Sequence, residues 1–400
     1  MKRRFISDGH IIDSGIFASI LNLIVEEGGG YEIVSFEVGR THQNTSHLEI
    51  DLVCDTKEKL ENITKKLIQK GCYEKSAGEA LLKTAPKNAT VPEDFYSTTN
   101  HRTEVYMNRQ WHPVEKQRMD AVIVLEKDNV FRCRKLRDVK EGDRVVCNSD
   151  SVRVFPPPRD RKTDVFGFMS GEVSSERSVN VAVDRIAEEM RLMKEEGRKI
   201  VAVAGPVVVH TGGAPALASL IRKGYIHGVL SGNALAVHDI ESVLFGTSLG
   251  IDLKTGRPSH EGHKNHMRAI NSVNSHGSIA ECVKQGVIDR GIMYELTVNK
   301  IPYCLAGSIR DDGPLPETET DMIKSQDGYS EIAKDSAMVL MLATMLHSIG
   351  TGNMLPSWVK TICIDINPAV VTKLMDRGSG QTIGFVSDVG LFLNMLEARL

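Results

Sequence analysis

The pattern of apolar and polar positions is most distinctive at residues 201–213, VAVAGPVVVHTGG. The nearly continuous run of small and β-branched residues predicts a strand buried on both faces, ending at Thr211-Gly212-Gly213. Apolar residues at helical spacing then predict a helix over 214–223. Backbone N–H groups at a glycine-opened helix start can accept phosphate, so this unit suits a nucleotide. Many α/β proteins turn in this way without a ligand, and the pattern alone leaves both readings open.

The same alternation of strand and helix repeats from residue 160 to the end of the chain, which predicts a mostly parallel sheet covered by helices on both faces. An amphipathic helix is expected over 178–195, and further strands over 228–231, 301–306, 359–364 and 382–386. Amide or acidic residues follow these strands: Asn233, Asp311, Asp312, Asp365, Asn367 and Asp388, with Ile366 and Val389 in the same turns. Ligands of open α/β sheets bind outside the carboxyl ends of the strands, so the recurrence favours a dinucleotide site. Each residue taken singly also suits a tight turn or a helix N-cap.

Residues 1–85 have the pattern of a small α+β module. Apolar residues at helical spacing predict helices over 11–25 and 57–69. Between them, two runs of alternating apolar and polar residues, 31–38 and 46–54, predict a pair of strands. The order helix, strand, strand, helix fits a ferredoxin-like sandwich. The loop between the strands carries Arg40 and Asn44 among other polar residues. It is either a solvated hairpin loop or a clamp for an amino-acid carboxylate, with Arg40 as the charge.

Residues 86–158 predict a small β-rich domain, because short β-prone runs alternate with turn signals. The runs are 119–125, 130–134, 144–147 and 151–155, and three prolines at 156–158 close the domain. Before them lies a polar loop behind two aromatic residues, DFYSTTNH at 94–101. It is either an ordinary loop or a site that recognises a small polar substrate through Tyr96, Ser97, Thr98 and Asn100.

Composition describes an ordinary globular protein of several domains, with 400 residues, 41% hydrophobic and 25% charged. A formal net charge of −3 gives no reason to expect nucleic acid or an anionic membrane as a partner. The seven cysteines are dispersed without a Cys-x-x-Cys pair, which favours reduced thiols in the cytoplasm over a disulfide scaffold. No apolar run is long enough for a membrane span. The histidines of the segment 262–277 match no common zinc spacing, so no metal is expected.

Six segments together carry a resemblance to a known family. They are GRTHQNTSHLEI, DFYSTTNHRTEV, FGFMSGEVSSERSV, AGPVVVHTGGAPAL, AGSIRDDGPLP and FVSDVGLFLNML. With them the chain resembles the archaeal-type ornithine cyclodeaminases, whose N-terminal part is the conserved region of lysine-oxoglutarate reductase and saccharopine dehydrogenase proteins. Its C-terminal part is similar, more distantly, to deoxyhypusine synthase. The resemblance implies an α/β protein with a Rossmann-like NAD-binding domain over 159–400.

The resemblance also implies which residues would hold NAD. A Ser-Asn-x-x-Ser turn falls on Ser170, Gly171 and Ser174, with Gly171 in place of the amide. A Thr-Ala-Gly-Gly turn falls on His210, Thr211, Gly212 and Gly213, with His210 in place of a hydroxyl. The remaining turns fall on Asp311 and Asp312, on Asn367, and on Asp388 and Val389. The lysine that carries the butyl group in deoxyhypusine synthase has no clear counterpart, because the only lysine between the last two turns, Lys373, lies in a predicted helix.

The implied reaction converts L-ornithine to L-proline and ammonia with NAD recycled in place. It needs a base and a proton donor, for which the candidates are His210, His276, Asp311 and Asp312, with His210, Asp311 and Asp312 favoured. The implied partners are ornithine and further copies of the chain, as a dimer or tetramer. Two alternatives remain at this stage: an NAD-dependent aminobutyl transferase like deoxyhypusine synthase, and a non-catalytic sensor of NAD or an amino acid.

Overall fold

The structure is a computed structural model, and it describes residues 1–12, 15–39, 44–75, 78–156, 175–311, 313–377 and 382–400. Contacts divide the chain into two compact units. The first holds residues 1–168, 353–358 and 379–381, and the second holds the rest. Each unit is described by itself below.

The N-terminal part of the first unit is a ferredoxin-like sandwich, as predicted. Its elements are β1 (Lys2–Gly9), α1 (Ile16–Glu26), β2 (Gly30–Glu37), β3 (Ser46–Val53), α2 (Lys57–Gln69) and β4 (Cys72–Glu74). The sheet order is β2-β3-β1-β4, and all its pairs are antiparallel. Phe5, Ile20, Ile50 and Ile63 are fully buried between sheet and helices. The hydrophobic pattern missed β1 and β4, because β1 is rich in charge and β4 has only three residues.

The rest of the first unit is a mixed sheet with the order β11-β6-β7-β9-β8-β10-β5, which confirms the predicted β-rich part. Its strands are β5 (Leu82–Thr84), β6 (Arg102–Met107), β7 (Gln110–Glu115), β8 (Val122–Leu125), β9 (Phe131–Arg134), β10 (Arg144–Val146) and β11 (Val152–Phe155). The β6–β7 hairpin was not predicted, because its turn residues Asn108 and Arg109 adopt positive φ without a glycine. The Glu79 carboxylate accepts from both of their backbone N–H groups, at 2.8 and 3.1 Å. The segment 353–358 belongs to this unit, and the backbone N–H of Ser357 donates to the carbonyl of Asn100 at 2.8 Å.

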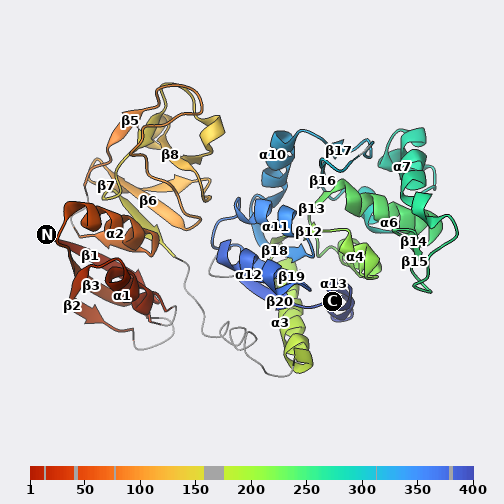
Figure 1. Cartoon of the computed structure of the whole chain (residues 1–400), viewed down its shortest axis with the longest axis horizontal. Coiled ribbons are helices and arrows are strands. Elements are labelled where there is room, and N and C mark those ends of the chain that lie inside the picture. The colour runs from red at the N-terminus through yellow and green to blue at the C-terminus, as the bar shows by residue number, and fades with distance from the viewer. Residues whose placement is uncertain (13–14, 40–43, 76–77, 157–174, 312, 378–381) are drawn as a thin grey trace. The chain divides into compact units, whose positions relative to one another are not determined.

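The second unit is built on a parallel sheet (Figure 1). Its strands are β12 (Lys199–Ala204), β13 (Val229–Gly232), β16 (Tyr303–Ala306), β17 (Thr318–Glu319), β18 (Ser336–Leu342), β19 (Lys360–Asp365) and β20 (Thr382–Val386). The order is β17-β16-β13-β12-β18-β19-β20. Without the short edge strand β17, the strands numbered along the chain read 3-2-1-4-5-6, which is the order of dinucleotide-binding Rossmann folds. The Rossmann-like expectation is therefore confirmed.

Helices cover both faces of this sheet, as expected from right-handed crossovers. The helices that flank the strands are α3 (Ser175–Glu195), α4 (Val207–His210), α5 (Ala214–Arg222), α6 (Asn233–Phe245), α10 (Met322–Ala333), α11 (Met345–Gly352), α12 (Pro368–Arg377) and α13 (Val389–Glu397). In Figure 1, α10, α11 and α12 lie on one side of the sheet, and α4, α6 and α13 lie on the other. Between α6 and β16 the chain forms the β14 (Thr247–Ser248) and β15 (Ile251–Asp252) hairpin, the short 3-10 turn η5 (Gly262–Lys264), and helices α7 (Asn265–His276), α8 (Ile279–Lys284) and α9 (Ile292–Val298).

One prediction about this sheet was wrong, and one strand was missed. The strand expected to run from Val201 to the turn at Thr211 ends at Ala204, and the VVVH segment is instead helix α4. Gly205-Pro206 causes the change, because proline cannot donate to a strand ladder and suits the start of a helix. Strand β18 was not predicted at all. Its run SAMVLML has no periodicity that separates a buried strand from a buried helix.

No helix in the described part of the chain is both long enough and apolar enough to cross a membrane.

Candidate cofactor and substrate site

The strand order reverses between β12 and β18, and open α/β sheets bind their ligands in a crevice at the carboxyl ends of the strands on either side of this point. The two ends approach closely at Gly205. Its backbone N–H donates to the carbonyl of Leu342 at 3.0 Å, and a Cβ at this position would lie 2.4 Å from the carbonyl oxygen of Ala343. Glycine is therefore required here by contact between two backbones. This is where the fold predicts a dinucleotide.

The helix N-termini at this edge differ in how their free N–H groups are used. Gly213 is the N-cap of α5 and Gly232 is the N-cap of α6, and neither helix has a side-chain cap. By contrast, Asn367 accepts from the N–H of Ala369 at 3.0 Å at the start of α12, and Asp388 accepts from Leu391 at 2.8 Å at the start of α13. Of these four helices, α5 and α6 start without a side-chain cap, so their first N–H groups fit the pyrophosphate of a dinucleotide.

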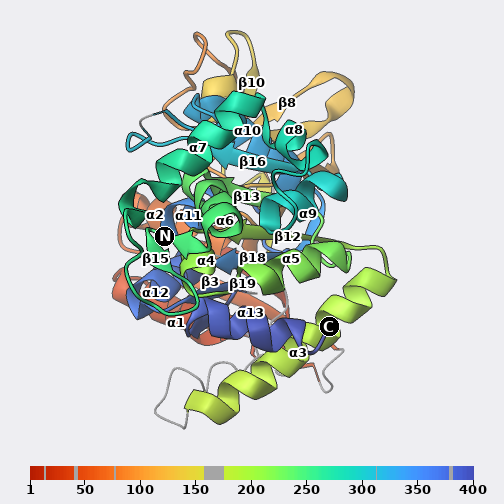
Figure 2. The same ribbon diagram turned by 90° about the vertical axis from the view of Figure 1, so that its right-hand side faces the viewer.

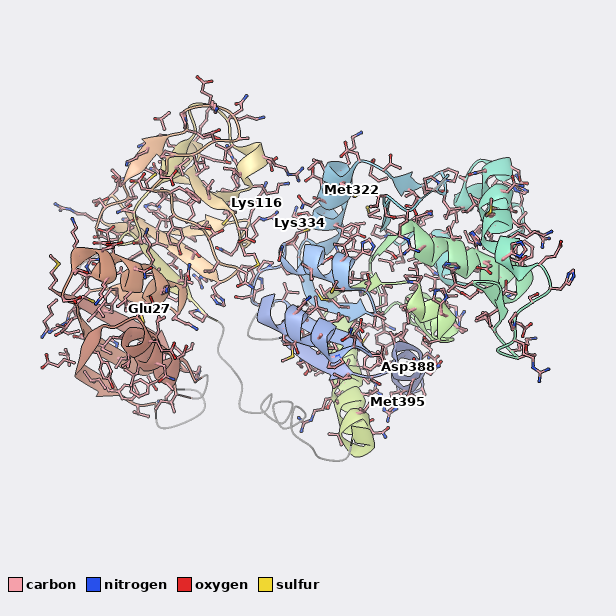
Figure 3. All side chains as sticks on the ribbon, viewed as in Figure 1. Glu27, Lys116, Met322, Lys334, Asp388 and Met395 are labelled. Carbon is pink, nitrogen blue, oxygen red and sulfur yellow. The ribbon has the colours of Figure 1, made fainter. Side chains whose placement is uncertain are left out.

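The turn Thr211-Gly212-Gly213 packs against the start of α13, where Figure 3 labels Asp388. A Cβ on Gly390 would lie 2.3 Å from the carbonyl oxygen of Thr211, so these segments touch through backbone. Gly212 has φ of +76° with open space beside it. The structure thus brings together the predicted residues 211–213 and 388–389, although Thr211 uses its hydroxyl internally, donating to Val207 O at 2.9 Å. Val389 is buried.

Asn233 and Asp311, both predicted from the sequence, also meet. The amide Nδ2 of Asn233 lies 3.5 Å from Oδ1 of Asp311. Its Oδ1 accepts from the N–H of Leu315 and the hydroxyl of Thr318, at 3.1 and 2.9 Å. The second carboxylate oxygen of Asp311 accepts from the N–H of Ser308 at 2.7 Å. The buried amide of Asn233 therefore holds the loop after β16 in place.

The turn after β19 is more open. Asp365 accepts from the N–H of Asn367 at 2.8 Å, and Ile366 is 71% exposed. Asp365, Asn367 and Asp388 therefore act as turn or N-cap residues, which is one of the two roles that the sequence allowed. A role in binding a ligand is compatible with them, since each carboxylate or amide keeps unused acceptor positions.

Sequence reasoning missed a histidine and a tyrosine beside the crevice. His347 lies on α11, and a Cβ on Gly232 would lie 2.9 Å from its Nε2. The hydroxyl of Tyr329, on α10, contacts His347 Nδ1 at 2.8 Å and donates to Ser231 O at 2.6 Å. Burial lowers the pKa of His347, so its ring is neutral at neutral pH. No signal in the sequence marked the pair, because the helix and strand that carry His347 to the sheet edge were not predicted.

His210 lies at the end of α4, and its pKa is lowered to about 4 by burial and by His238, while Glu241 acts in the opposite direction. Its Nδ1 is 2.7 Å from the hydroxyl of Ser248. The ring of His238 meets it edge-on, with centroids 4.8 Å apart. His210 is therefore an unprotonated imidazole that can accept a proton.

Three family profiles cover nearly the whole chain. The conserved region of the LOR/SDH bifunctional enzyme matches residues 3–101. The first C-terminal region of the ArgZ-like arginine dihydrolases matches 102–183, and their C-terminal Rossmann fold matches 184–396. A protein named ornithine cyclodeaminase from Methanocaldococcus jannaschii is 48% identical over 98% of this chain and 94% of its own length. One from Archaeoglobus fulgidus is 47% identical over 100% of this chain and 98% of its own.

This chain belongs to the archaeal-type ornithine cyclodeaminase family.

Family members also occur as the C-terminal part of larger proteins. The bifunctional arginine dihydrolase/ornithine cyclodeaminase AgrE of Nostoc is 46% identical over 98% of this chain but only 57% of its own length. Among solved structures, apo ArgZ, an arginine dihydrolase of cyanobacteria, matches with a TM-score of 0.87 at 43% identity, over 100% of this chain and 58% of that chain. A complex of AgrE with ornithine and NAD+ matches with a TM-score of 0.55 at 43% identity, over 100% of this chain and 57% of that one.

The predicted substrate residues lie in the first unit and have mixed environments. Tyr96, Thr98 and Asn100 are buried, while Ser97 and Asn44 are exposed. Thr98 donates to Arg118 O at 2.8 Å. The hydroxyl of Tyr96 has no hydrogen-bond partner among the described residues, which leaves a buried donor available. The predicted residues that lie outside the described part of the chain are Arg40, Ser170, Gly171, Ser174 and Asp312.

Proposed function

We propose that this protein is an ornithine cyclodeaminase that converts L-ornithine to L-proline and ammonia with bound NAD. The observation that carries the proposal is the full-length match to proteins named ornithine cyclodeaminase, at 46–48% identity. The Rossmann strand order supplies a place for the cofactor. The complex of AgrE with ornithine and NAD+ supports the same pair of ligands.

NAD fits the second unit at the carboxyl edge of the sheet. The uncapped N–H groups of α5 and α6 would bind the pyrophosphate, and the glycines at 205, 212 and 213 keep side chains away from it. Asp365 and Asp388 would accept from ribose hydroxyls, which favours NAD over NADP because a 2′-phosphate would face a carboxylate. Bound NAD would supply the hydride acceptor and donor for the reaction.

The residues of the chain would handle the protons. We propose that His210 takes the proton of the α-ammonium group of ornithine. Burial lowers its pKa to about 4, which keeps the ring unprotonated at neutral pH but also makes it a weak base, so this role requires its proton affinity to rise when substrate is bound. The same proton can return to the departing ammonia, which leaves the protein unchanged after each turnover. Asp311 and Asp312 remain the proposed acidic partners. Holding the two amino groups of ornithine in one pocket makes cyclisation effectively intramolecular.

On the substrate side, we propose that Arg40 and Asn44 and the segment containing Tyr96, Ser97, Thr98 and Asn100 help bind ornithine. A guanidinium suits the substrate carboxylate. The unused hydroxyl of Tyr96 supports a polar ligand nearby, because a buried donor without an acceptor costs about 1–3 kcal/mol.

The test is to purify the protein, measure NAD released on denaturation, and assay ornithine for proline and ammonia in equal amounts. Turnover that depends on bound or added NAD supports the proposal. Release of aminobutyl groups from spermidine without ornithine turnover would instead indicate the transferase. Tight binding of NAD or ornithine without turnover would indicate a sensor. A protein that neither contains nor binds NAD would refute the proposed function.

A further inference from the structure

A chain of polar side chains leads from His210 into the interior of the second unit. Helices α4 and α6 lie side by side and carry its histidines (Figure 2). His210 on α4 contacts Ser248 Oγ at 2.7 Å and meets His238 on α6 edge to face. His238 Nδ1 then lies 2.8 Å from Oε2 of Glu241, one turn further along α6.

Glu241 is fully buried, and its carboxylate is held by several donors. Its Oε1 accepts from the hydroxyl of Thr247 at 2.8 Å and the N–H of Gly250 at 3.0 Å. Its Oε2 accepts from the N–H of Leu249 at 3.2 Å, besides His238. Burial would raise the pKa of Glu241, but these hydrogen bonds, led by that of His238, hold it below its usual range. The interior of the unit therefore contains a charged carboxylate whose side-chain partners include an imidazole.

In the described part of the chain, no other charged side chain is hydrogen-bonded to His210, His238 or Glu241. Asn265, from α7, donates to Thr247 Oγ1 at 3.0 Å, and Arg268 on the same helix donates to Asn265 Oδ1 at 3.1 Å and stacks on Phe245. Asp239, the other buried carboxylate of α6, points to α9, where it accepts from the N–H groups of Ile292 and Met293 at 3.0 and 2.8 Å. Among the described residues, Glu241 is thus the only anion hydrogen-bonded to either histidine of the chain.

We propose that the buried Glu241 carboxylate stabilises His210 electrostatically when the His210 ring is protonated, while Ser248 fixes that ring; we call this electrostatic support the relay. This inference rests on the proposed function, in which His210 accepts the substrate proton. We assign the Nδ1–H of His210 as the donor to Ser248, which leaves a lone pair on Nε2, and no described residue is hydrogen-bonded to Nε2. When Nε2 takes the proton, the Glu241 anion favours the new positive charge, whereas His238 acts against it. The proton leaves again to ammonia, so charge and protons balance over a turnover.

A purely structural role for the same residues makes different predictions. In that case Glu241 only holds the β14–β15 hairpin. Removing the charge of Glu241 would then leave the titration and the reactivity of His210 unchanged. In the relay, removing the charge removes the group that favours the protonated ring. The relay therefore predicts a change in proton affinity at His210, which packing alone would not cause.

The test compares Glu241→Gln with Asp239→Asn in the full-length protein. Both exchange a buried carboxylate of α6 for its amide, but Asp239 faces away from the histidines. Two-dimensional NMR of ¹⁵N-histidine-labelled protein, with His210→Gln and His238→Gln for assignment, follows the ring nitrogens from pH 8 to below pH 4, so that the titration of His210 lies within the range. We expect neutral His210 at pH 7 as the Nδ1–H tautomer, and a downward shift of its titration in Glu241→Gln but not in Asp239→Asn. This readout needs no turnover, so it tests the relay separately from the reaction.

Steady-state kinetics complete the experiment. We expect kcat of Glu241→Gln to fall roughly 10- to 100-fold, with NAD affinity within about twofold of the wild type and the pH dependence of kcat/KM displaced. If Glu241→Gln does not fold, His238→Gln gives the converse comparison: it removes the group that acts against protonated His210, so the His210 titration should shift upward. Unchanged histidine titration together with an unchanged pH profile, in whichever variant folds, would overturn the relay. An inactive wild type with an intact NMR relay would refute the proposed function alone.

Discussion

At the scale of single residues, the fold decides which polar groups carry out chemistry and which only support the backbone. Tyr329 shows how this works at the crevice. Its hydroxyl has one proton and donates it to Ser231 O, so the contact with His347 is made by the Nδ1–H of the histidine. Tyr329 thereby fixes the His347 tautomer and leaves Nε2 as an acceptor beside Gly232. We expect Tyr329→Phe to cost about 1 kcal/mol of unfolding free energy, measured by urea denaturation.

His101 gives a prediction for pH. Burial, with a smaller effect of Lys70, lowers its pKa to about 4. In the unfolded chain this histidine takes up a proton near pH 6.5, whereas in the folded chain it does so only near pH 4. The stability that neutral His101 contributes is therefore complete above pH 6.5 and is lost as the pH falls towards 4. The difference corresponds to about 3 kcal/mol. We expect His101→Gln to flatten the loss of stability between pH 6.5 and 4, as followed by urea denaturation.

The control for this experiment is His263→Gln, at an exposed histidine of the second unit. It should leave the pH dependence of stability unchanged. An identical slope in wild type and His101→Gln would show that His101 does not stay neutral in the folded protein.

At the scale of elements, the contact between β12 and β18 depends on Gly205. A Cβ there would meet backbone atoms of Ala343, which cannot move aside as a side chain tip can. We expect Gly205→Ala to destabilise the protein by about 1–3 kcal/mol and to weaken NAD binding, because the crevice lies between these strand ends. Thermal unfolding and NAD titration measure the two effects.

Gly350→Ala is the matched control, since this glycine lies inside α11 with open space around its Cα. Alanine favours a helix interior over glycine, so this variant should be neutral or more stable by up to about 1 kcal/mol. Equal stability of the two variants would contradict the close approach at Gly205.

The start of α13 provides a second test at this scale, since Asp388 is both its N-cap and a proposed ribose ligand. Asp388→Ser keeps a capping oxygen but loses the charge and reach of the carboxylate, whereas Asp388→Ala loses both. We expect Asp388→Ala to cost about 1 kcal/mol of stability and Asp388→Ser much less, while both weaken NAD binding. Normal NAD affinity in both variants would restrict Asp388 to capping.

The sequence predicted elements well where periodicity was clear. Helix α2 and strands β3 and β20 lie within a residue of the expected bounds, because their apolar and polar residues alternate with the period of a helix or a strand. Prediction from the sequence failed where apolar residues were continuous, as in β18 and in the VVVH segment of α4, because such runs do not distinguish a strand from a helix. The site followed the same rule. Turn residues such as Asn233 and Asp311 were found, but Tyr329, His347 and Glu241 were not, because only tertiary packing brings them to the histidines and strand ends.

At the scale of the whole molecule, the two units have separate sheets and separate cores. We expect calorimetry to resolve two transitions, of which only that of the parallel-sheet unit rises with NAD. At 100 times the dissociation constant, NAD adds about 2.7 kcal/mol to the unit that binds it. A single transition that moves as a whole would show that the units unfold together. His101→Gln should alter the transition of the first unit instead, so the two variables together show which transition belongs to which unit.

The path of the chain between the units has a further consequence for dissecting the protein. Residues 353–358 leave the second unit after α11, join the first unit, and return as β19. A gene divided after residue 168 would therefore encode a first half that lacks a piece of its own fold, including the Ser357 N–H that Asn100 accepts. The second half would carry that piece as an unmatched insertion. Independent expression of the halves should yield poorly soluble fragments, and mixing them should restore folding as in split-protein complementation.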